Sequence, residues 1–408
     1  MIPTIVGKRL LVVEEALKDH VGHWYEYVKS VVELNGKEGV LVTAVVHCRV
    51  LPEISKELSA IPAFERSNWD GVYAHPRAWR RYLGVFRHNW LVYRTMSQII
   101  DKHGPFDCLF APTVIVHHVL GWRLLFAIKG RKIKRLVLLF RNNAGSYEPG
   151  SSTPKFKRSA AILATTLRSF SKSIRSGRVL LATDSDRLAR EYELLCGLRP
   201  VVFPSPRLAQ FLDQPDAPKT QNEPLIFSSL GPARFEKGID LLQEAIKLCL
   251  RRGLKRPVKF VIQWNQPILE ADGQEYFPDT SLVGDDRVEF IRRPLESAEY
   301  DATIARSDCL LLPYRRDSYF ARISGVAVEA ATAGIPMIFT NDTWNADLVD
   351  KFGAGIGVED GDIEGLANAV NAMIEGFELF HKVAIERKTA AQDAHSAHTF
   401  IEKLWGWP

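Results

Sequence analysis

The sequence has no run of about 18 consecutive apolar residues, the length that a membrane-spanning helix needs. Its first residues also lack the order of basic, apolar and small residues that is typical of a signal peptide. Cysteine is scarce: the 408 residues include five, and none forms a Cys-x-x-Cys pair. We therefore expect a cytoplasmic chain whose cysteines are reduced thiols in the core.

The composition excludes a disordered chain and indicates more than one domain. Hydrophobic residues make up 46% and charged residues 25%, which is ordinary for a globular protein. The net charge of +5 is unevenly distributed, with +14 in residues 1–205 and −9 in residues 206–408. A basic half and an acidic half favour two domains with different partners.

Short apolar runs alternate with amphipathic stretches in both halves. The predicted strands cover residues 9–14, 39–46, 108–111, 135–140 and 178–183, then 225–230, 258–263, 288–291, 309–313 and 335–339. These runs are continuous, which is typical of parallel strands covered on both faces. Prolines at 204, 206, 215, 218 and 224 mark a linker between the halves. The sequence thus predicts an α/β fold with a parallel sheet in each half.

A strand-to-helix turn at residues 228–238 combines glycines with cations. Gly231 follows the strand, Arg234 and Lys237 come next, and Gly238 precedes an amphipathic helix. Glycine lets the backbone approach a phosphate, and a helix N-terminus adds N–H groups with partial positive charge. The spacing is not that of a P-loop. The turn therefore predicts an anion site, with an ordinary loop carrying solvated charges as the alternative.

A second stretch, at residues 310–336, has a similar design. A buried strand ends at Pro313, and a helix is predicted from Ser324, which suits an N-cap, to Gly334. Glu329 lies about one turn inside this helix, and Arg322 lies just before it. An acidic residue at this depth suits a pair of sugar hydroxyls, although a lone helical Glu is more often a solvated surface residue.

Together the two stretches resemble the donor-nucleotide half of GT-B glycosyltransferases, specifically the retaining glycosyltransferase family 4 (group 1). That family shows Gly-Arg-x4-Lys-Gly, which Gly231 and Lys237-Gly238 match, and Glu-x7-Glu, whose second Glu is Glu329. Residues 353–362 resemble its Gly-x-Gly signature followed by Gly-Asp. Pro232 replaces the family's Arg, with Arg234 two places later. Ala321 replaces the first Glu, which contacts the donor sugar in the family.

The resemblance implies two Rossmann-like domains that face each other across a cleft. Residues 1–205 would bind the acceptor, residues 206–224 would be the linker, and residues 225–380 would bind the nucleotide sugar. Residues 381–408 would form a helix that packs back on the N-terminal domain. The implied activity is sugar transfer, with retention, from a nucleotide-diphosphate sugar to a glycan or lipid-linked acceptor, in polysaccharide or cell-envelope glycan synthesis. No cofactor is implied.

The resemblance also implies roles for individual residues. The predicted catalytic residues are Arg234, Lys237 and His118, and the predicted nucleotide-sugar-binding residues are Gly22, Gly231, Arg322, Ser324, Gly325 and Glu329. For His118 and the other histidines, a packed or surface His is the alternative. Asp184-Ser-Asp186 looks like the metal-binding Asp-x-Asp of a different glycosyltransferase fold, but its place at a strand end suits a helix cap. We therefore expect no metal.

Two basic stretches without acidic residues remain, at 71–100 and 149–183. The first interleaves arginines with aromatic residues, which suits an anionic membrane surface or single-stranded nucleic acid. A solvated basic face whose aromatic side chains point into the core is the third interpretation. We expect no nucleic-acid partner because no known binding signature is present. The predicted location is the cytoplasm or the inner face of the membrane.

One alternative function stays open at this point. Because Ala321 replaces an acidic residue, the chain could be a non-catalytic protein of the same fold that binds a sugar nucleotide or acts as a scaffold. The presence of Arg234, Lys237 and Glu329 together favours an enzyme.

Overall fold

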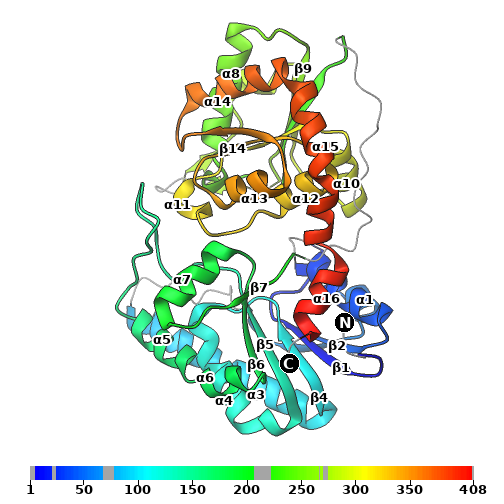
Figure 1. The fold of residues 1–408 in the computed structure, drawn as a ribbon, viewed down its shortest axis with the longest axis vertical. Coiled ribbons are helices and arrows are strands. Elements are labelled where there is room, and N and C mark those ends of the chain that lie inside the picture. Colours follow the sequence, from blue (N-terminus) through cyan, green and yellow to red (C-terminus); the bar gives the residue numbers. More distant parts are fainter. Residues whose placement is uncertain are drawn as a thin grey trace. The chain divides into compact units, whose positions relative to one another are not determined.

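The computed structural model describes residues 5–20, 24–67, 78–205, 222–265, 267–269 and 274–406. The chain divides into two compact units (Figure 1). The first unit comprises residues 1–146, 153–208 and 396–408, and the second comprises residues 147–152 and 209–395.

The first unit contains a seven-stranded parallel sheet in the order β3-β2-β1-β4-β5-β6-β7. Its strands are β1 (Arg9–Glu14), β2 (Leu41–His47), β3 (Ala60–Phe64), β4 (Phe106–Ala111), β5 (Ile133–Phe140), β6 (Val179–Thr183) and β7 (Val201–Val202). Its helices are α1 (Trp24–Lys37), α2 (Pro52–Glu57), α3 (Ala78–His103), η1 (Val116–His118), α4 (Val119–Lys129), η2 (Gly130–Lys132), α5 (Ala160–Arg168), α6 (Ser171–Arg175), α7 (Asp186–Cys196) and α16 (Ala397–Trp405).

The second unit contains a six-stranded parallel sheet in the order β12-β9-β8-β13-β14-β15 and a short antiparallel pair, β10-β11. Its strands are β8 (Leu225–Ser229), β9 (Val258–Gln263), β10 (Ile268–Leu269), β11 (Glu275–Tyr276), β12 (Val288–Ile291), β13 (Cys309–Leu312), β14 (Met337–Thr340) and β15 (Gly355–Val358). Its helices are η3 (Phe235–Lys237), α8 (Ile239–Arg252), α9 (Thr280–Val283), α10 (Ser297–Ala305), α11 (Arg316–Tyr319), α12 (Gly325–Ala333), α13 (Trp344–Phe352), α14 (Ile363–Glu375) and α15 (Phe377–Ala394).

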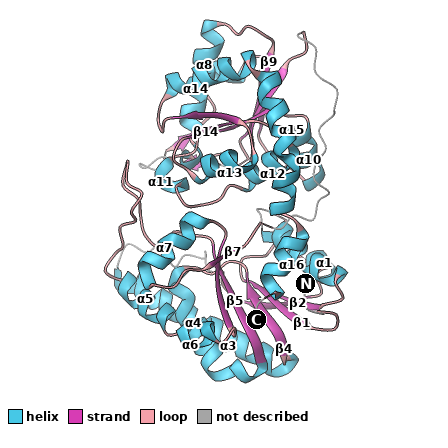
Figure 2. Cartoon of the chain, in the orientation of Figure 1, coloured by secondary structure: helices cyan, strands magenta, loops and turns pink. Residues whose placement is uncertain are grey.

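The continuous apolar strands are buried on both faces, which confirms the predicted α/β fold with a parallel sheet in each half. In β13, Cys309 and Leu311 belong to a core with α8 and α14, whereas Leu310 and Leu312 belong to a core with α12 and α13. Figure 2 shows these two pairs of helices on opposite sides of the strands. A strand covered on both sides has no polar face, so alternation is absent from its sequence.

The C-terminal residues form two helices where the sequence predicted one helix over 381–408. Helix α15 packs against α12 in the second unit, whereas α16 lies in the core of the first. The buried indole of Trp405 donates a hydrogen bond of 2.8 Å from Nε1 to Oδ1 of Asn35. The predicted linker at 206–224 lies mostly outside the described residues.

The expectation that all five cysteines lie in the core is wrong at one position. All five are free thiols, and four are buried, but Cys48 is exposed. Cys48 follows β2, where the strand leaves the sheet, so its side chain lies outside the core.

A buried carboxyl group ends β1, an interior strand of the first sheet. Glu14 is buried, and the backbone N–H of Ala16 donates to its Oε1 at 3.2 Å. Burial raises the pKa of Glu14 from 4.5 to about 7, although a hydrogen bond from Thr113 opposes this shift. In the folded protein this carboxyl group therefore holds a proton over a pH range in which the unfolded chain has lost it.

We expect this proton to make stability depend on pH. Since the folded state binds more protons than the unfolded state between about pH 4.5 and 7, the contribution of Glu14 to the unfolding free energy falls as pH rises through that window. Glu14→Gln keeps an acceptor oxygen and removes the titration. The difference in unfolding free energy between Glu14→Gln and the unsubstituted protein should shift in favour of the variant by up to roughly 3 kcal/mol from pH 5 to pH 8. Urea unfolding of the full chain measures this difference. Glu38→Gln, at an exposed position, is the matched control. If Glu14→Gln changes the unfolding free energy by the same amount at pH 5 and pH 8, Glu14 is not the group that titrates.

Candidate functional site

The candidate site lies at the carboxyl edge of the second sheet, where β8 and β13 are neighbours. From β8 the chain continues to β9 on one side, while β13 lies on the other side, so the strand order reverses at this point. In open α/β sheets, ligands bind at such a switch point, beyond the carboxyl ends of the strands. The two motifs that the sequence singled out follow these two strands.

A glycine allows the two loops to meet. Gly238 has a φ of +67° and ends the short helix η3, and a Cβ at this position would clash with the carbonyl oxygen of Pro313. Both the left-handed backbone and the close approach therefore require glycine. Helix α8 begins at the next residue, as the sequence predicted.

Lys237 lies against the turn that follows β8. Its Nζ is 3.4 Å from the carbonyl oxygen of Leu230 and 5.7 Å from the centre of the Tyr314 ring. A Cβ at Gly231, whose φ is +83°, would lie 2.6 Å from the same Nζ. Burial, with the nearby charge of Arg234, lowers the pKa of Lys237 from 10.5 to about 8. Positive charge is thus held in surroundings that disfavour it.

Two arginines lie near Lys237 and share one carboxylate. Oε1 of Glu236 is 3.4 Å from NH1 of Arg234 and 3.6 Å from NH2 of Arg322. The Arg322 guanidinium also lies 4.9 Å from the centre of the Tyr319 ring. Arg234 and Arg322 each lower the pKa of Lys237 through their charge, so the three cations act on one another.

The start of α12 faces solvent. Ser324 is the N-cap, and its side chain accepts a hydrogen bond of 3.2 Å from the backbone N–H of Ala327. Gly325 is exposed, and a Cβ placed there would have no other atom within 4 Å. Gly334, with a φ of +76°, ends the helix. Both predicted helix ends are confirmed, and the first turn of α12 carries the partial positive charge of a helix N-terminus.

Glu329 lies on the second turn of α12 and is half-buried. The hydroxyl of Tyr300, on α10, donates a hydrogen bond of 2.7 Å to its Oε2. Glu329 also raises the pKa of Lys237 through its negative charge, which places the two groups in one electrostatic neighbourhood. The interpretation of Glu329 as a fully solvated surface residue is therefore wrong.

The turn at Gly231 is fixed by a residue that the sequence analysis missed. The backbone N–H of Gly231 donates a hydrogen bond of 2.6 Å to Oε1 of Gln263, which ends β9. Glu236 and Tyr314 were missed as well. Gln263 and Tyr314 stand at the carboxyl ends of apolar strands, and Glu236 stands between the two predicted cations. These positions in the sequence could have identified the three residues as candidates for the site.

Ala321 is fully buried, with 0% of its surface exposed. The position where the resemblance puts a sugar-binding Glu thus has neither a carboxylate nor access to solvent. The neighbouring Arg322 is half-buried, so its guanidinium is the charged group at this place.

The remaining predicted residues lie elsewhere. The structure brings Gly231, Arg234, Lys237, Arg322, Ser324, Gly325 and Glu329 to one edge of the second unit. His118 lies in the first unit, is 1% exposed and stacks on His88 with ring centres 3.8 Å apart. Burial lowers its pKa to about 2, with a smaller contribution from His88. Gly22 lies outside the described residues.

Asp184 and Asp186 flank a helix cap. The hydroxyl of Ser185 accepts a hydrogen bond of 3.0 Å from the backbone N–H of Leu188 at the start of α7. Asp184 forms an ion pair of 3.2 Å with Arg141. The helix-cap interpretation is confirmed, and within the described part of the chain no group of three His, Cys, Asp or Glu residues is arranged to hold a metal ion.

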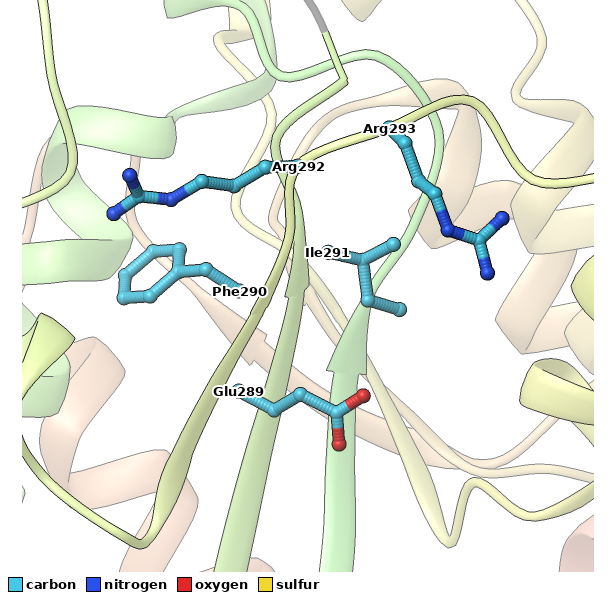
Figure 3. A pocket seen from close by; sticks show the side chains of 5 residues that line it. All are labelled: Glu289, Phe290, Ile291, Arg292 and Arg293. Atoms are coloured by element: carbon cyan, nitrogen blue, oxygen red, sulfur yellow. The ribbon is translucent and has the colours of Figure 1, made fainter.

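A shallow hollow of about 350 Å³ lies at the edge strand β12 of the second sheet, and none of the predicted residues lines it. Its lining residues are Glu289, Phe290, Ile291, Arg292 and Arg293. Figure 3 shows Phe290 and Arg292 on one side of the strand and the other three on the opposite side. Glu289 pairs with Lys259 at 2.7 Å, and Arg293 pairs with Glu299 at 2.6 Å. These charges are therefore held within the second unit.

Comparisons with known proteins fit this geometry. Residues 224–376 match the family model of the group 1 glycosyl transferases. No curated protein matches the sequence. Among solved structures, HepE of Anabaena in complex with UDP and glucose aligns with a TM-score of 0.64 at 14% identity, over 97% of this chain and 98% of that chain.

Two further structures cover the chain equally well. The lipopolysaccharide outer core galactosyltransferase WaaB has a TM-score of 0.61 at 14% identity, over 98% of this chain and 99% of that chain. The sucrose-phosphate synthase of Thermosynechococcus elongatus has a TM-score of 0.63 at 12% identity, over 97% of each chain. The chain therefore has the GT-B fold of two Rossmann-like units, and residues 224–376 of its second unit are similar to the group 1 glycosyl transferases.

Proposed function

We propose that this protein transfers a sugar from a nucleotide-diphosphate sugar to a glycan or lipid-linked acceptor, with retention at the anomeric carbon and without a metal ion. The observation that carries the proposal is the cluster of Lys237, Arg234 and Arg322 at the switch point of the second sheet. The second unit would bind the donor, and the first would bind the acceptor. HepE has been solved with UDP and with UDP-glucose, so a UDP-linked hexose is the first donor to test.

The cations would act on the leaving group. When the bond between the sugar and the diphosphate breaks, negative charge builds up on the phosphate oxygen. Groups fixed at that point stabilise the transition state more than the bound substrate. Lys237 and Arg234 would supply this charge from one loop, and the N-terminus of α12 at Ser324-Gly325 would add its partial charge from the other. His118 would need to leave its buried position to contact the donor, so the proposal assigns catalysis to Lys237 and Arg234.

Glu329 would bind the nucleotide without taking part in the reaction. A carboxylate accepts hydrogen bonds from two neighbouring hydroxyls, as a ribose presents them. The charge of Glu329 already acts on Lys237, so its carboxylate would lie near a nucleotide whose diphosphate is bound there. Arg322 would take the place of the acidic residue that Ala321 replaces, which favours a donor sugar with acceptor groups at that position. Polysaccharide or cell-envelope glycan synthesis is the setting that the resemblance suggests.

Buried Ala321 favours one alternative, a non-catalytic protein of the same fold that binds a sugar nucleotide. A screen of nucleotide-sugar donors separates the two functions. The enzyme releases a nucleoside diphosphate from one donor and is stabilised against heat by it. The alternative is stabilised by a donor and releases nothing in the presence of any acceptor mixture.

Lys237→Ala should lower kcat/KM by roughly 10- to 100-fold, because a hydrogen bond to a charged group contributes about 1.5–3 kcal/mol. Release of the nucleoside diphosphate measures this loss. The control is Lys382→Ala on α15, which removes an exposed ammonium from the same unit. The fold should survive, because Lys237 is a charge that burial disfavours. Unchanged turnover in Lys237→Ala would remove this residue from the catalytic machinery.

The pH dependence of binding provides a second measurement for the same residue. A bound diphosphate favours the charged ammonium, whereas the free protein loses this proton near pH 8. Affinity for UDP should therefore fall above about pH 8, by up to tenfold per pH unit. In Lys237→Ala this fall should disappear, and a fall of equal slope there would assign the titration to another group.

Glu329→Gln should weaken binding of UDP by roughly 5- to 30-fold, because a charge-assisted hydrogen bond becomes a neutral one. Calorimetry with UDP and with pyrophosphate distinguishes the two roles. Glu329→Gln should weaken the binding of UDP, which carries the ribose, and leave the binding of pyrophosphate unchanged. Lys237→Ala should weaken the binding of both ligands. If Glu329→Gln weakens the binding of UDP and of pyrophosphate equally, Glu329 affects binding through the charge of Lys237 and does not contact the ribose.

A further inference from the structure

Helix α3 of the first unit carries exposed aromatic side chains in its N-terminal half and buried apolar side chains in its C-terminal half. Val92, Met96 and Ile100 lie on the buried face and are each 0% exposed. In the N-terminal half, four large aromatic side chains are more than half exposed: Trp79 (58%), Tyr82 (67%), Phe86 (65%) and Trp90 (52%). The exposed face of an amphipathic helix is ordinarily polar. A row of exposed aromatic rings on one helix therefore marks an interaction surface.

These four rings form one stripe along the helix. With Leu83, which is 38% exposed, their positions follow the spacing i, i+3, i+4, i+7 and i+11. At about 100° per residue, the five side chains fall within roughly 100° of the helix circumference. We call this set of five residues the aromatic face of α3. The interpretation in which the aromatic residues of this stretch point into the core is wrong for these positions.

The aromatic face is bordered by positive charge. Arg80, Arg87 and Arg94 recur every seven residues, so they lie along one side of the stripe, and all three are exposed. The Arg80 guanidinium lies 5.3 Å from the centre of the Trp79 ring. No acidic residue occurs between positions 78 and 100. The border thus attracts an anionic partner along four turns of the helix.

The neighbouring helices add aliphatic side chains. Helix α3 packs against α4, and α4 packs against α5, within the first unit (Figure 1). Leu120, Leu124 and Ile128 recur every four residues on α4 and are 52%, 36% and 53% exposed, and Ile162 on α5 is 72% exposed. Among the described helices, none is long and apolar enough to cross a bilayer.

We propose that the aromatic face of α3 docks on an anionic membrane surface and brings the first unit to a lipid-linked acceptor. The docking is inferred from the residues of α3 alone. The lipid-linked acceptor rests on the proposed function. Trp and Tyr rings suit the boundary between headgroups and acyl chains because they combine an apolar body with a polar tip. The arginine border supplies attraction to anionic headgroups.

The same chemistry fits nucleic acid less well. Single-stranded nucleic acid binds in grooves where bases stack on aromatic rings. The aromatic face is the outer side of a helix and is not a groove. A lipid bilayer accepts aromatic and aliphatic side chains equally. The observations therefore favour the membrane.

Vesicle co-sedimentation tests the proposal with the full chain and no donor. The protein should pellet with phosphatidylcholine vesicles that contain phosphatidylglycerol and not with phosphatidylcholine alone, and salt should weaken the binding. The triple variant Arg80→Gln, Arg87→Gln, Arg94→Gln should bind roughly 10- to 100-fold more weakly. The triple variant Trp79→Gln, Phe86→Gln, Trp90→Gln should bind more weakly at every salt concentration, because apolar burial is not screened.

A matched triple variant controls for net charge. Lys37→Gln, Arg49→Gln, Lys56→Gln removes three exposed cations from other elements of the first unit and should bind as the unsubstituted protein does. Equal loss in this control, equal pelleting with neutral vesicles, or no pelleting at all would overturn the proposal. Two other results would also overturn the proposal. One is that the unsubstituted protein is a dimer without vesicles and that the aromatic triple variant is a monomer. The other is that the protein binds oligonucleotides and does not bind vesicles.

The test is independent of catalysis. Vesicle binding without sugar transfer would leave the docking surface intact and refute the proposed function. If both hold, transfer to an acceptor embedded in anionic vesicles should fall in the two α3 variants, while donor hydrolysis in solution stays unchanged. Equal loss of both rates would show that α3 supports the fold and not the docking.

Discussion

Lys237 keeps an ammonium group where burial and a neighbouring arginine disfavour its charge, and the other charged groups of the candidate site are arranged around it. Glu236 and Glu329 oppose the effect, yet the pKa of Lys237 still lies well below its ordinary value. A site of this kind is poorly satisfied when empty, and an anion would relieve it. Under the proposed function, the free energy lost in holding the cation would be regained when a diphosphate binds, because the site is already organised for it.

The backbone maintains this arrangement through two close contacts. Gly238 allows the loop after β8 to touch Pro313 at the end of β13, and Gln263 fixes the turn at Gly231. Three neighbouring strands, β9, β8 and β13, therefore each contribute one part of the site from the same sheet edge. Ser324 then orients the start of α12 beside these loops through its cap. Rigid strands determine where the cations lie, while the loops themselves carry the functional groups.

The sequence predicted the parts of this structure that follow local rules. Continuous Val, Leu and Ile runs gave the strands because buried parallel strands need no polar face, and Ser324 and Gly334 gave the ends of α12 because caps have their own chemistry. Gln263 was not predictable, since its partner is a backbone N–H thirty-two positions away. Burial of His118 was equally hidden, because a histidine after a strand can point into the core or out of it. The contact of Glu329 with Tyr300 also joins two helices that the sequence does not connect.

Helix α3 shows why an apolar pattern alone does not decide what is buried. Its apolar residues are exposed in the N-terminal half and buried at Val92 and Met96 further along, and only the surrounding fold decides which of them enter the core. The N-terminal half keeps its rings exposed beside arginines whose charge is screened by salt within about 8 Å. The cations of the second unit are different, because the half-buried Lys237 is screened far less. Under the two proposals the chain would separate two electrostatic tasks: exposed charge on the first unit would act at long range and reversibly, whereas half-buried charge on the second would act at contact distance on a single anion.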